Sequence, residues 1–200
     1  MKILRAPTVC AFVAISTTAS VAAAEDGLYY GASIGISQYT SDVFDFDATT
    51  AETATLGGLL GYRKDMTQGR FWSVEFELDI PVDGEMTYDD GSASCTSVSP
   101  DWCNVDAVSR LRAIYGMPVG GGYDAVVGAG LAAASGRSED GPGNYVDTIG
   151  SGWTVAVGLQ RGFSSGSIAR VEVIYDEISA TDNSYEPKLE NLSLRGSFLF

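Results

Sequence analysis

Charged residues recur at every second position in several segments of the chain, and their types and spacing limit the chemistry open to the protein. Side chains two residues apart point to the same side of an extended strand, so each run places its charges on one face. Carboxylates and guanidinium groups gathered on such a face can form bidentate ion pairs, or they can line a charged passage for ions. The set contains six acids and five arginines: Arg63, Glu75, Glu77, Asp79, Asp106, Arg110, Arg112, Arg170, Glu172, Asp176 and Arg195.

The chain of 200 residues contains no histidine. General bases near neutral pH, Ser-His and Cys-His dyads and imidazole metal sites all need that ring, so much ordinary catalysis is excluded. We therefore expect no enzyme activity, no catalytic residue, no cofactor and no metal. The sequence also carries 26 acidic against 12 basic residues, a net charge of −14. Because phosphate binding needs a basic stripe, this balance speaks against a nucleic-acid partner.

Residues 1–24 have the composition of an export signal. Basic Lys2 and Arg5 come first, an apolar run follows, and small residues end the segment at Ala24. The apolar run is far shorter than the roughly 18–20 residues that a membrane-spanning helix needs. We therefore predict a signal peptide that is cleaved after Ala24, which leaves a single domain over residues 25–200.

Two cysteines, Cys95 and Cys103, follow the predicted signal. Their spacing differs from the Cys-x-x-Cys of zinc and redox sites, and the chain has no histidine to complete a zinc shell. In an oxidising compartment outside the cytoplasm we expect them to form a disulfide. Closure of this short loop would contribute about 2–3 kcal/mol of stability.

Eight segments alternate apolar residues with small or polar ones, which is the pattern of half-buried β-strands. The clearest begins at Trp72, where every second residue is large and apolar and the residues between are serine or acidic. We expect strands over 28–37, 54–63, 71–80, 105–116, 123–134, 151–160, 169–176 and 192–200. Such strands fit a β-sandwich, a soluble lipocalin-like barrel or a membrane barrel.

Two features favour the membrane barrel, in which apolar side chains face lipid and small or charged ones fill the interior. Aromatic residues cluster near the strand ends, as in an interfacial girdle, and glycines lie on the opposite face. The intervening segments also alternate in length: 38–53, 81–104, 135–150 and 177–190 are long, whereas 64–70, 117–122 and 161–167 are short. An exported barrel would place the long segments outside the cell and the short ones in the periplasm.

The run from Trp72 to Leu78 and the terminal strand over 192–200 resemble the small outer-membrane β-barrels of the OmpA and OmpX type. The resemblance implies an all-β fold, an eight-stranded antiparallel up-and-down transmembrane β-barrel with long extracellular loops and short periplasmic turns. It implies a place in the outer membrane of a Gram-negative envelope, among outer-membrane lipid and lipopolysaccharide. A final strand ending in phenylalanine is similar to the signal that the barrel assembly machinery recognises, so we expect Phe200 to direct assembly. We also expect a monomer.

Within such a barrel the charged set faces the lumen. Adjacent strands would bring Glu75 and Glu77 opposite Arg110 and Arg112, and an eight-stranded barrel is narrow enough for side chains to fill. We therefore expect ion pairs to close the lumen, and the protein to have a structural, envelope-stabilising or surface-presenting role. Three alternatives stay open: a small porin for ions or small solutes, an adhesin acting through its acidic loops, and a soluble lipocalin-like carrier.

Overall fold

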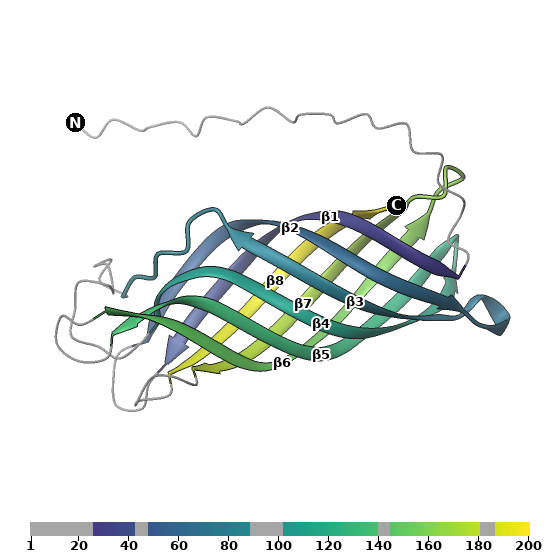
Figure 1. Ribbon diagram of the computed structural model, residues 1–200. Coiled ribbons are helices and arrows are strands. Elements are labelled where there is room, and N and C mark those ends of the chain that lie inside the picture. The colour runs from purple at the N-terminus through teal and green to yellow at the C-terminus, as the bar shows by residue number, and fades with distance from the viewer. Residues whose placement is uncertain (1–25, 43–47, 89–101, 140–144, 181–186) are drawn as a thin grey trace, which may run out of the picture.

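The computed structural model describes residues 26–42, 48–88, 102–139, 145–180 and 187–200. Eight antiparallel strands close into a barrel, in which each strand pairs with its neighbours in sequence and β8 pairs with β1 (Figure 1). The strands are β1 (Gly27–Asp42), β2 (Thr49–Asp65), β3 (Phe71–Pro81), β4 (Trp102–Gly120), β5 (Tyr123–Glu139), β6 (Tyr145–Gly162), β7 (Ile168–Ala180) and β8 (Lys188–Leu199). The predicted eight-stranded antiparallel barrel is therefore confirmed. The predicted signal peptide lies outside the described residues.

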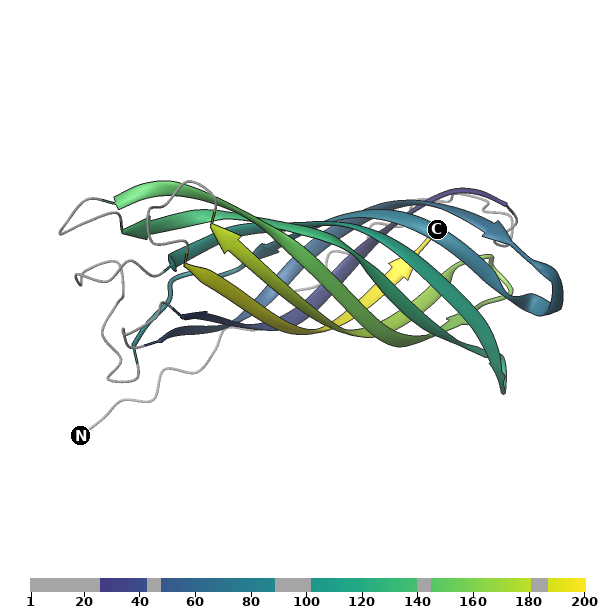
Figure 2. The ribbon, with the colours of Figure 1, turned by 90° about the horizontal axis from the view of Figure 1, so that it is seen from below.

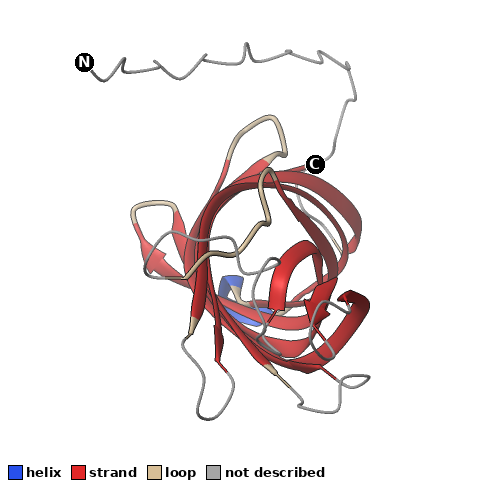
Figure 3. Ribbon diagram, turned by 90° about the vertical axis from the view of Figure 1, so that its left-hand side faces the viewer, coloured by secondary structure: helices blue, strands red, loops and turns tan. Residues whose placement is uncertain are grey.

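The two ends of the barrel differ. We name the turn end after its connections 66–70, 121–122 and 163–167, and the loop end after its connections 43–48, 82–101, 140–144 and 181–187. The tilted strands run between these ends (Figure 2), and a view onto the loop end shows the closed ring (Figure 3). Gly121 and Gly122 have φ values of 64° and 78°. A two-residue hairpin turn with both central φ angles positive favours glycine, which explains the Gly-Gly pair.

The alternation seen in the sequence separates an outer wall from the lumen. Large apolar side chains stand on the outer wall, such as Ile36 at 66% exposed and Leu131 at 66%, whereas Ser37 beside Ile36 is 2% exposed. At the turn end, aromatic rings pack on this wall, with centroids 5.7 Å apart for Tyr30 and Phe200. This arrangement matches the apolar band and aromatic girdle of membrane barrels.

Three of the predicted long connections are too long. Strand β1 continues to Asp42, β5 to Glu139 and β7 to Ala180, so much of 38–53, 135–150 and 177–190 belongs to strands. The prediction took the end of the lipid-facing pattern as the end of the strand. The backbone hydrogen bonds between strands do not depend on lipid, so the strands continue beyond the residues whose apolar side chains face the membrane.

The segment directly after β3 stays on the wall of the barrel. The Thr50 and Thr87 backbones exchange two hydrogen bonds of 2.8 Å, and the Met86 N–H donates to the Cys103 carbonyl at 3.0 Å. Close passage of this segment requires glycine at Gly84, where a Cβ would clash with the Val105 carbonyl. The segment thereby places Met86, fully buried, inside the loop end.

No helix among the described residues is long and apolar enough to cross a membrane. The only helical element in those residues is a short 3-10 turn, η1 (Thr67–Gly69), between β2 and β3.

Candidate functional site

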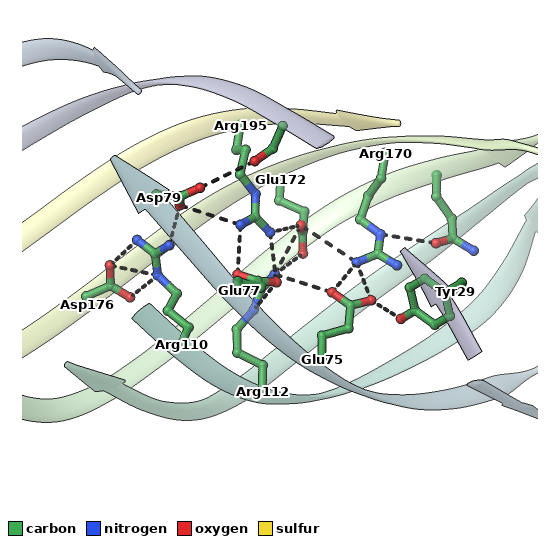
Figure 4. Close-up of polar contacts among 12 residues, drawn as sticks. Tyr29, Glu75, Glu77, Asp79, Arg110, Arg112, Arg170, Glu172, Asp176 and Arg195 are labelled. Atoms are coloured by element: carbon green, nitrogen blue, oxygen red, sulfur yellow. Dashed lines mark hydrogen bonds and ion pairs between the residues drawn. The ribbon is translucent and has the colours of Figure 1, made fainter. Parts of the chain in front are cut away.

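Five carboxylates and four arginines meet in the middle of the lumen (Figure 4). They come from two opposite walls. Strands β3 and β4 supply Glu75, Glu77, Asp79, Arg110 and Arg112, and strands β7 and β8 supply Arg170, Glu172, Asp176 and Arg195. We call these nine residues the lumen network. Because β3 and β4 are not hydrogen-bonded to β7 or β8, every ion pair between the two groups crosses the barrel.

The part of the lumen network nearest the loop end is organised by Arg110. Its Nε donates to both Asp176 oxygens at 2.9 and 3.0 Å, and its Nη2 donates to Asp176 Oδ2 at 2.6 Å. Its Nη1 donates to Asp79 on β3. Asn191 Nδ2 adds a 2.8 Å hydrogen bond to Asp176 Oδ2. One guanidinium therefore joins β3 to β7, which is a bidentate geometry specific to arginine.

The centre of the network contains two arginines and two glutamates. Arg195 Nη1 donates to Glu77 Oε2 at 2.7 Å, and its Nη2 donates to Glu172 Oε2 at 2.8 Å. Arg112 on the other wall also donates to both glutamates, at 3.0 Å from Nε to Glu77 and 3.1 Å from Nη2 to Glu172. Each glutamate is therefore shared by two arginines, and the four side chains cross-link four strands.

The part nearest the turn end is centred on Glu75. Arg170 Nη1 donates to its two oxygens at 2.7 and 2.8 Å. The Tyr29 hydroxyl on β1 also donates to Glu75 Oε1. Gln160 on β6 accepts a 3.3 Å hydrogen bond from Arg170 Nε. This carboxylate is thereby linked to strands on three sides of the lumen.

Burial makes the pairing essential to the fold. The four arginine side chains are 0–2% exposed and their five carboxylate partners 0–5%. Taking such charges out of water costs several kcal/mol for each ion, which only close pairing and hydrogen bonds can offset. Glycine makes room for the network at one tight point, because a Cβ on Gly57 would clash with Asp79 Oδ1.

Apolar side chains occupy the lumen on both sides of the network. Toward the loop end they form one cluster, which includes the fully buried Tyr39, Met86, Trp102, Ile178 and Leu189. Toward the turn end two smaller clusters are made by Leu59, Ile168 and Leu199, and by Phe71, Ile114 and Val126. The lumen is therefore layered, with a charged middle between two apolar layers.

Two members of the predicted charged set lie apart from this network. Arg63 lies at the turn end, where its Nε donates to Asp65 Oδ1 at 2.7 Å and its guanidinium covers the Phe71 ring at 3.7 Å. Asp106 was wrongly predicted to face the lumen, because it is exposed on the outer wall and accepts a hydrogen bond from Asn104. The reason is an irregularity in β4, where the register shifts between Val105 and Ala107.

Four neutral residues that join the network were not predicted: Tyr29, Ser33, Gln160 and Asn191. All four occupy inward positions of their strands, next to lipid-facing neighbours such as Tyr30, Leu159 and Leu192. The alternation alone could have identified them. A search restricted to charges omits them, although they supply the hydrogen bonds that charges in a dry lumen need.

The remaining predicted residues bear on assembly and stability. Phe200 exchanges two backbone hydrogen bonds with Tyr30, of 2.8 and 3.1 Å, and so takes part in barrel closure. Cys103 is buried in β4, but Cys95 lies outside the described residues, so the disulfide stays a prediction. Within the described part of the chain, no group of three or more Asp, Glu, Cys or His side chains could hold a metal ion.

An exposed ion pair ties the first described residue to the turn end. The Asp26 carboxylate accepts hydrogen bonds from Lys64 Nζ and, at 2.7 Å, from the Asp65 N–H. These hydrogen bonds lower the pKa of the Asp26 carboxyl below its ordinary value of 3.8. The start of β1 is thereby fastened to the end of β2.

Solved structures of small outer-membrane barrels share this fold. The chain is similar to the outer membrane protein AlkL, studied in lipid bilayers, with 15% identity, a TM-score of 0.54 and coverage of 94% of this chain and 97% of that one. It is similar to Neisserial surface protein A, with 13% identity, a TM-score of 0.51 and coverage of 86% and 98%. The attachment invasion locus protein Ail of Yersinia pestis gives 12% identity, a TM-score of 0.49 and coverage of 88% and 99%.

No curated protein sequence matches the chain. The family model for the outer membrane protein beta-barrel domain matches residues 8–198, which is nearly the whole chain. That match agrees with the closed antiparallel ring, the lipid-facing apolar wall and the charged lumen described above. The protein belongs to the outer-membrane β-barrel family and is located in the outer membrane.

Proposed function

We propose that the protein is a closed, non-conducting barrel that stabilises the outer membrane and holds its loop end at the cell surface. The observation that carries this proposal is the layered lumen, in which the nine-residue network spans the barrel from wall to wall. A passage for ions or solutes would have to break several buried ion pairs at once. It would also have to displace the apolar layer around Trp102 and Met86.

The porin alternative has less support. A conducting constriction needs charges that are hydrated and able to exchange partners with passing ions. Here Arg110, Arg112, Arg170 and Arg195 are each at most 2% exposed, and each holds a carboxylate of the opposite wall: Asp176, Glu172, Glu75 and Glu77, respectively. Such groups act as cross-links between strands, and this favours a structural role.

An enzyme is disfavoured by the chemistry of the chain. The sequence has no histidine, which removes the usual general base of barrel hydrolases. The carboxylates of the lumen network are held by arginines, so none is placed to act as a nucleophile or a general base.

The adhesin alternative concerns the loop end, where most of the excess acid of the sequence falls. The four connections 43–48, 82–101, 140–144 and 181–187 contain acidic residues and no lysine or arginine. An adhesive partner would have to recognise a strongly acidic surface. We propose that these segments lie outside the cell, and we propose no specific adhesive partner for them.

A liposome-swelling assay tests the closed lumen. Liposomes that contain the folded protein are diluted into isosmotic arabinose, and we expect them to swell no faster than protein-free liposomes. A swelling rate that rises with the amount of folded protein would contradict the proposal and favour the porin.

Epitope tags test the proposed orientation. One tag is inserted between residues 142 and 143 at the loop end, and a matched tag is inserted between 165 and 166 at the turn end. We expect antibodies to label intact cells that carry the first tag only. Labelling of the second tag alone would show that the turn end, and not the loop end, lies outside the cell.

A further inference from the structure

The outer wall has a hollow across strands β3 to β6, outside the lumen network. It has a volume of about 450 Å³ and is lined by Phe76, Ser109, Arg110, Leu111, Leu131, Ala132, Ala133, Ser151 and Gly152. Three small outward residues form its middle, because Ser109 pairs with Ala133 and Ala133 pairs with Ser151. Arg110, Ala132 and Gly152 alternate with these residues and occupy inward positions of their strands, so they line the hollow with their backbone and its floor is the strand backbone.

The hollow is continuous with the lipid-facing wall. Phe76, Leu111 and Leu131 stand along one side of it and are 54%, 50% and 66% exposed. These residues belong to the apolar band that meets hydrocarbon in a membrane barrel. The Ser109 hydroxyl is satisfied within the wall, since it donates to the Ala133 carbonyl at 3.4 Å. The hollow therefore presents a largely apolar surface to the membrane interior.

We propose that one acyl chain of a membrane lipid occupies this hollow and is held there longer than the other chains around the barrel. In a bilayer, lipid tails are as apolar as leucine, so association depends on van der Waals contact and shape. A groove left unfilled would lose those contacts along its whole floor. A flexible hydrocarbon chain from the surrounding membrane can follow the groove between large side chains without burying any polar group.

The barrel itself offers a matched control. Ala113 and Ala129 also pair across β4 and β5 and are exposed on the same wall, four residues from Ser109 and Ala133 along each strand. They do not line the hollow. Two leucines at Ser109 and Ala133 would fill the hollow, whereas two leucines at Ala113 and Ala129 would add the same apolar volume outside it.

Native mass spectrometry of the full-length expressed chain, purified from outer membranes, tests the proposal. The wild type, Ser109→Leu/Ala133→Leu and Ala113→Leu/Ala129→Leu are incubated in mild detergent with dipalmitoyl phosphatidylethanolamine. Folding is checked by heat-dependent gel mobility. We expect the wild type and the control variant to retain one lipid, and we expect the filled variant to lose it.

Equal lipid retention by the wild type and the filled variant would overturn the proposal. A wild-type dimer that the filled variant fails to form would also overturn it, because the occupant would then be a second copy of the chain. If the double substitution prevents folding, Ser151→Leu replaces it, with the same expected loss of the retained lipid.

Discussion

Replacing Arg110 with methionine should destabilise the barrel strongly. The arginine binds two carboxylates from opposite walls, with distances of 2.6–3.0 Å to Asp176 and a further bond to Asp79. After the substitution Asp176 keeps the hydrogen bond from Asn191, and Asp79 keeps Arg195 at 3.6 Å. Removing one partner of a buried ion pair costs about 3–5 kcal/mol, because the other charge is left uncompensated.

Urea unfolding in phospholipid vesicles measures this loss, with the combined fluorescence of Trp72, Trp102 and Trp153 as the signal. For an m-value of about 1–3 kcal/mol per molar urea, the midpoint should fall by about 1–5 M. Arg137→Met is the control, since Arg137 is exposed on β5 and such surface changes stay within about 0.5 kcal/mol. Arg110→Lys keeps the charge but not the bidentate geometry, so its midpoint should lie between those of the wild type and Arg110→Met.

If Arg110→Met lowers the free energy of unfolding by less than about 1 kcal/mol, the reasoning is refuted, because Asp176 and Asp79 must then be hydrated. If Arg110→Met does not fold, the urea midpoint of Arg110→Lys is compared with that of the wild type instead. A lysine variant as stable as the wild type would then contradict the role of the guanidinium fork.

Three further predictions concern the wall, the terminus and the turn end. Val171→Arg, on the lipid-facing side of β7, should cost about 2–4 kcal/mol in vesicle unfolding, and a near-neutral result would mean that Val171 does not face the hydrocarbon. Deleting Phe200 should lower the amount of folded protein in outer-membrane fractions, and wild-type levels would contradict its role in assembly. Because its pKa is lowered, the stability that Asp26 adds is present at pH 6 and lost as the pH falls below about 4. The wild type should therefore exceed Asp26→Asn in urea midpoint at pH 6, and by less at pH 3, and an equal midpoint at both pH values would show that the pair with Lys64 contributes nothing.

The fold followed from the sequence because a membrane barrel repeats one simple rule. Each strand alternates lipid-facing and lumen-facing residues, so a period of two is enough to assign both faces. The register of neighbouring strands was also predictable, since Glu75 lies opposite Arg112 and Glu77 lies opposite Arg110. The close ion pairs between these strands are diagonal, however, from Arg112 to Glu77 and from Arg110 to Asp79.

The ion pairs across the lumen could not be predicted in the same way. Whether Arg110 meets Asp176 depends on the stagger and tilt of all eight strands around the closed ring, and these are set by the whole barrel. The strand ends at the loop end were missed because β1, β5 and β7 continue past the lipid-facing pattern. Asp106 was assigned to the wrong face because one irregularity in β4 reverses the alternation there.

Single-channel recording in a planar bilayer tests the closed lumen most directly. The wild-type barrel is compared with Arg110→Ala/Arg112→Ala, and the folded state of both is verified in the same lipid by heat-dependent gel mobility. We predict that the wild type gives no stable conductance steps, because the buried ion pairs and the two apolar layers occupy the lumen. Stable steps from the folded wild type, altered in size by the double substitution, would contradict the closed lumen and identify the protein as a pore.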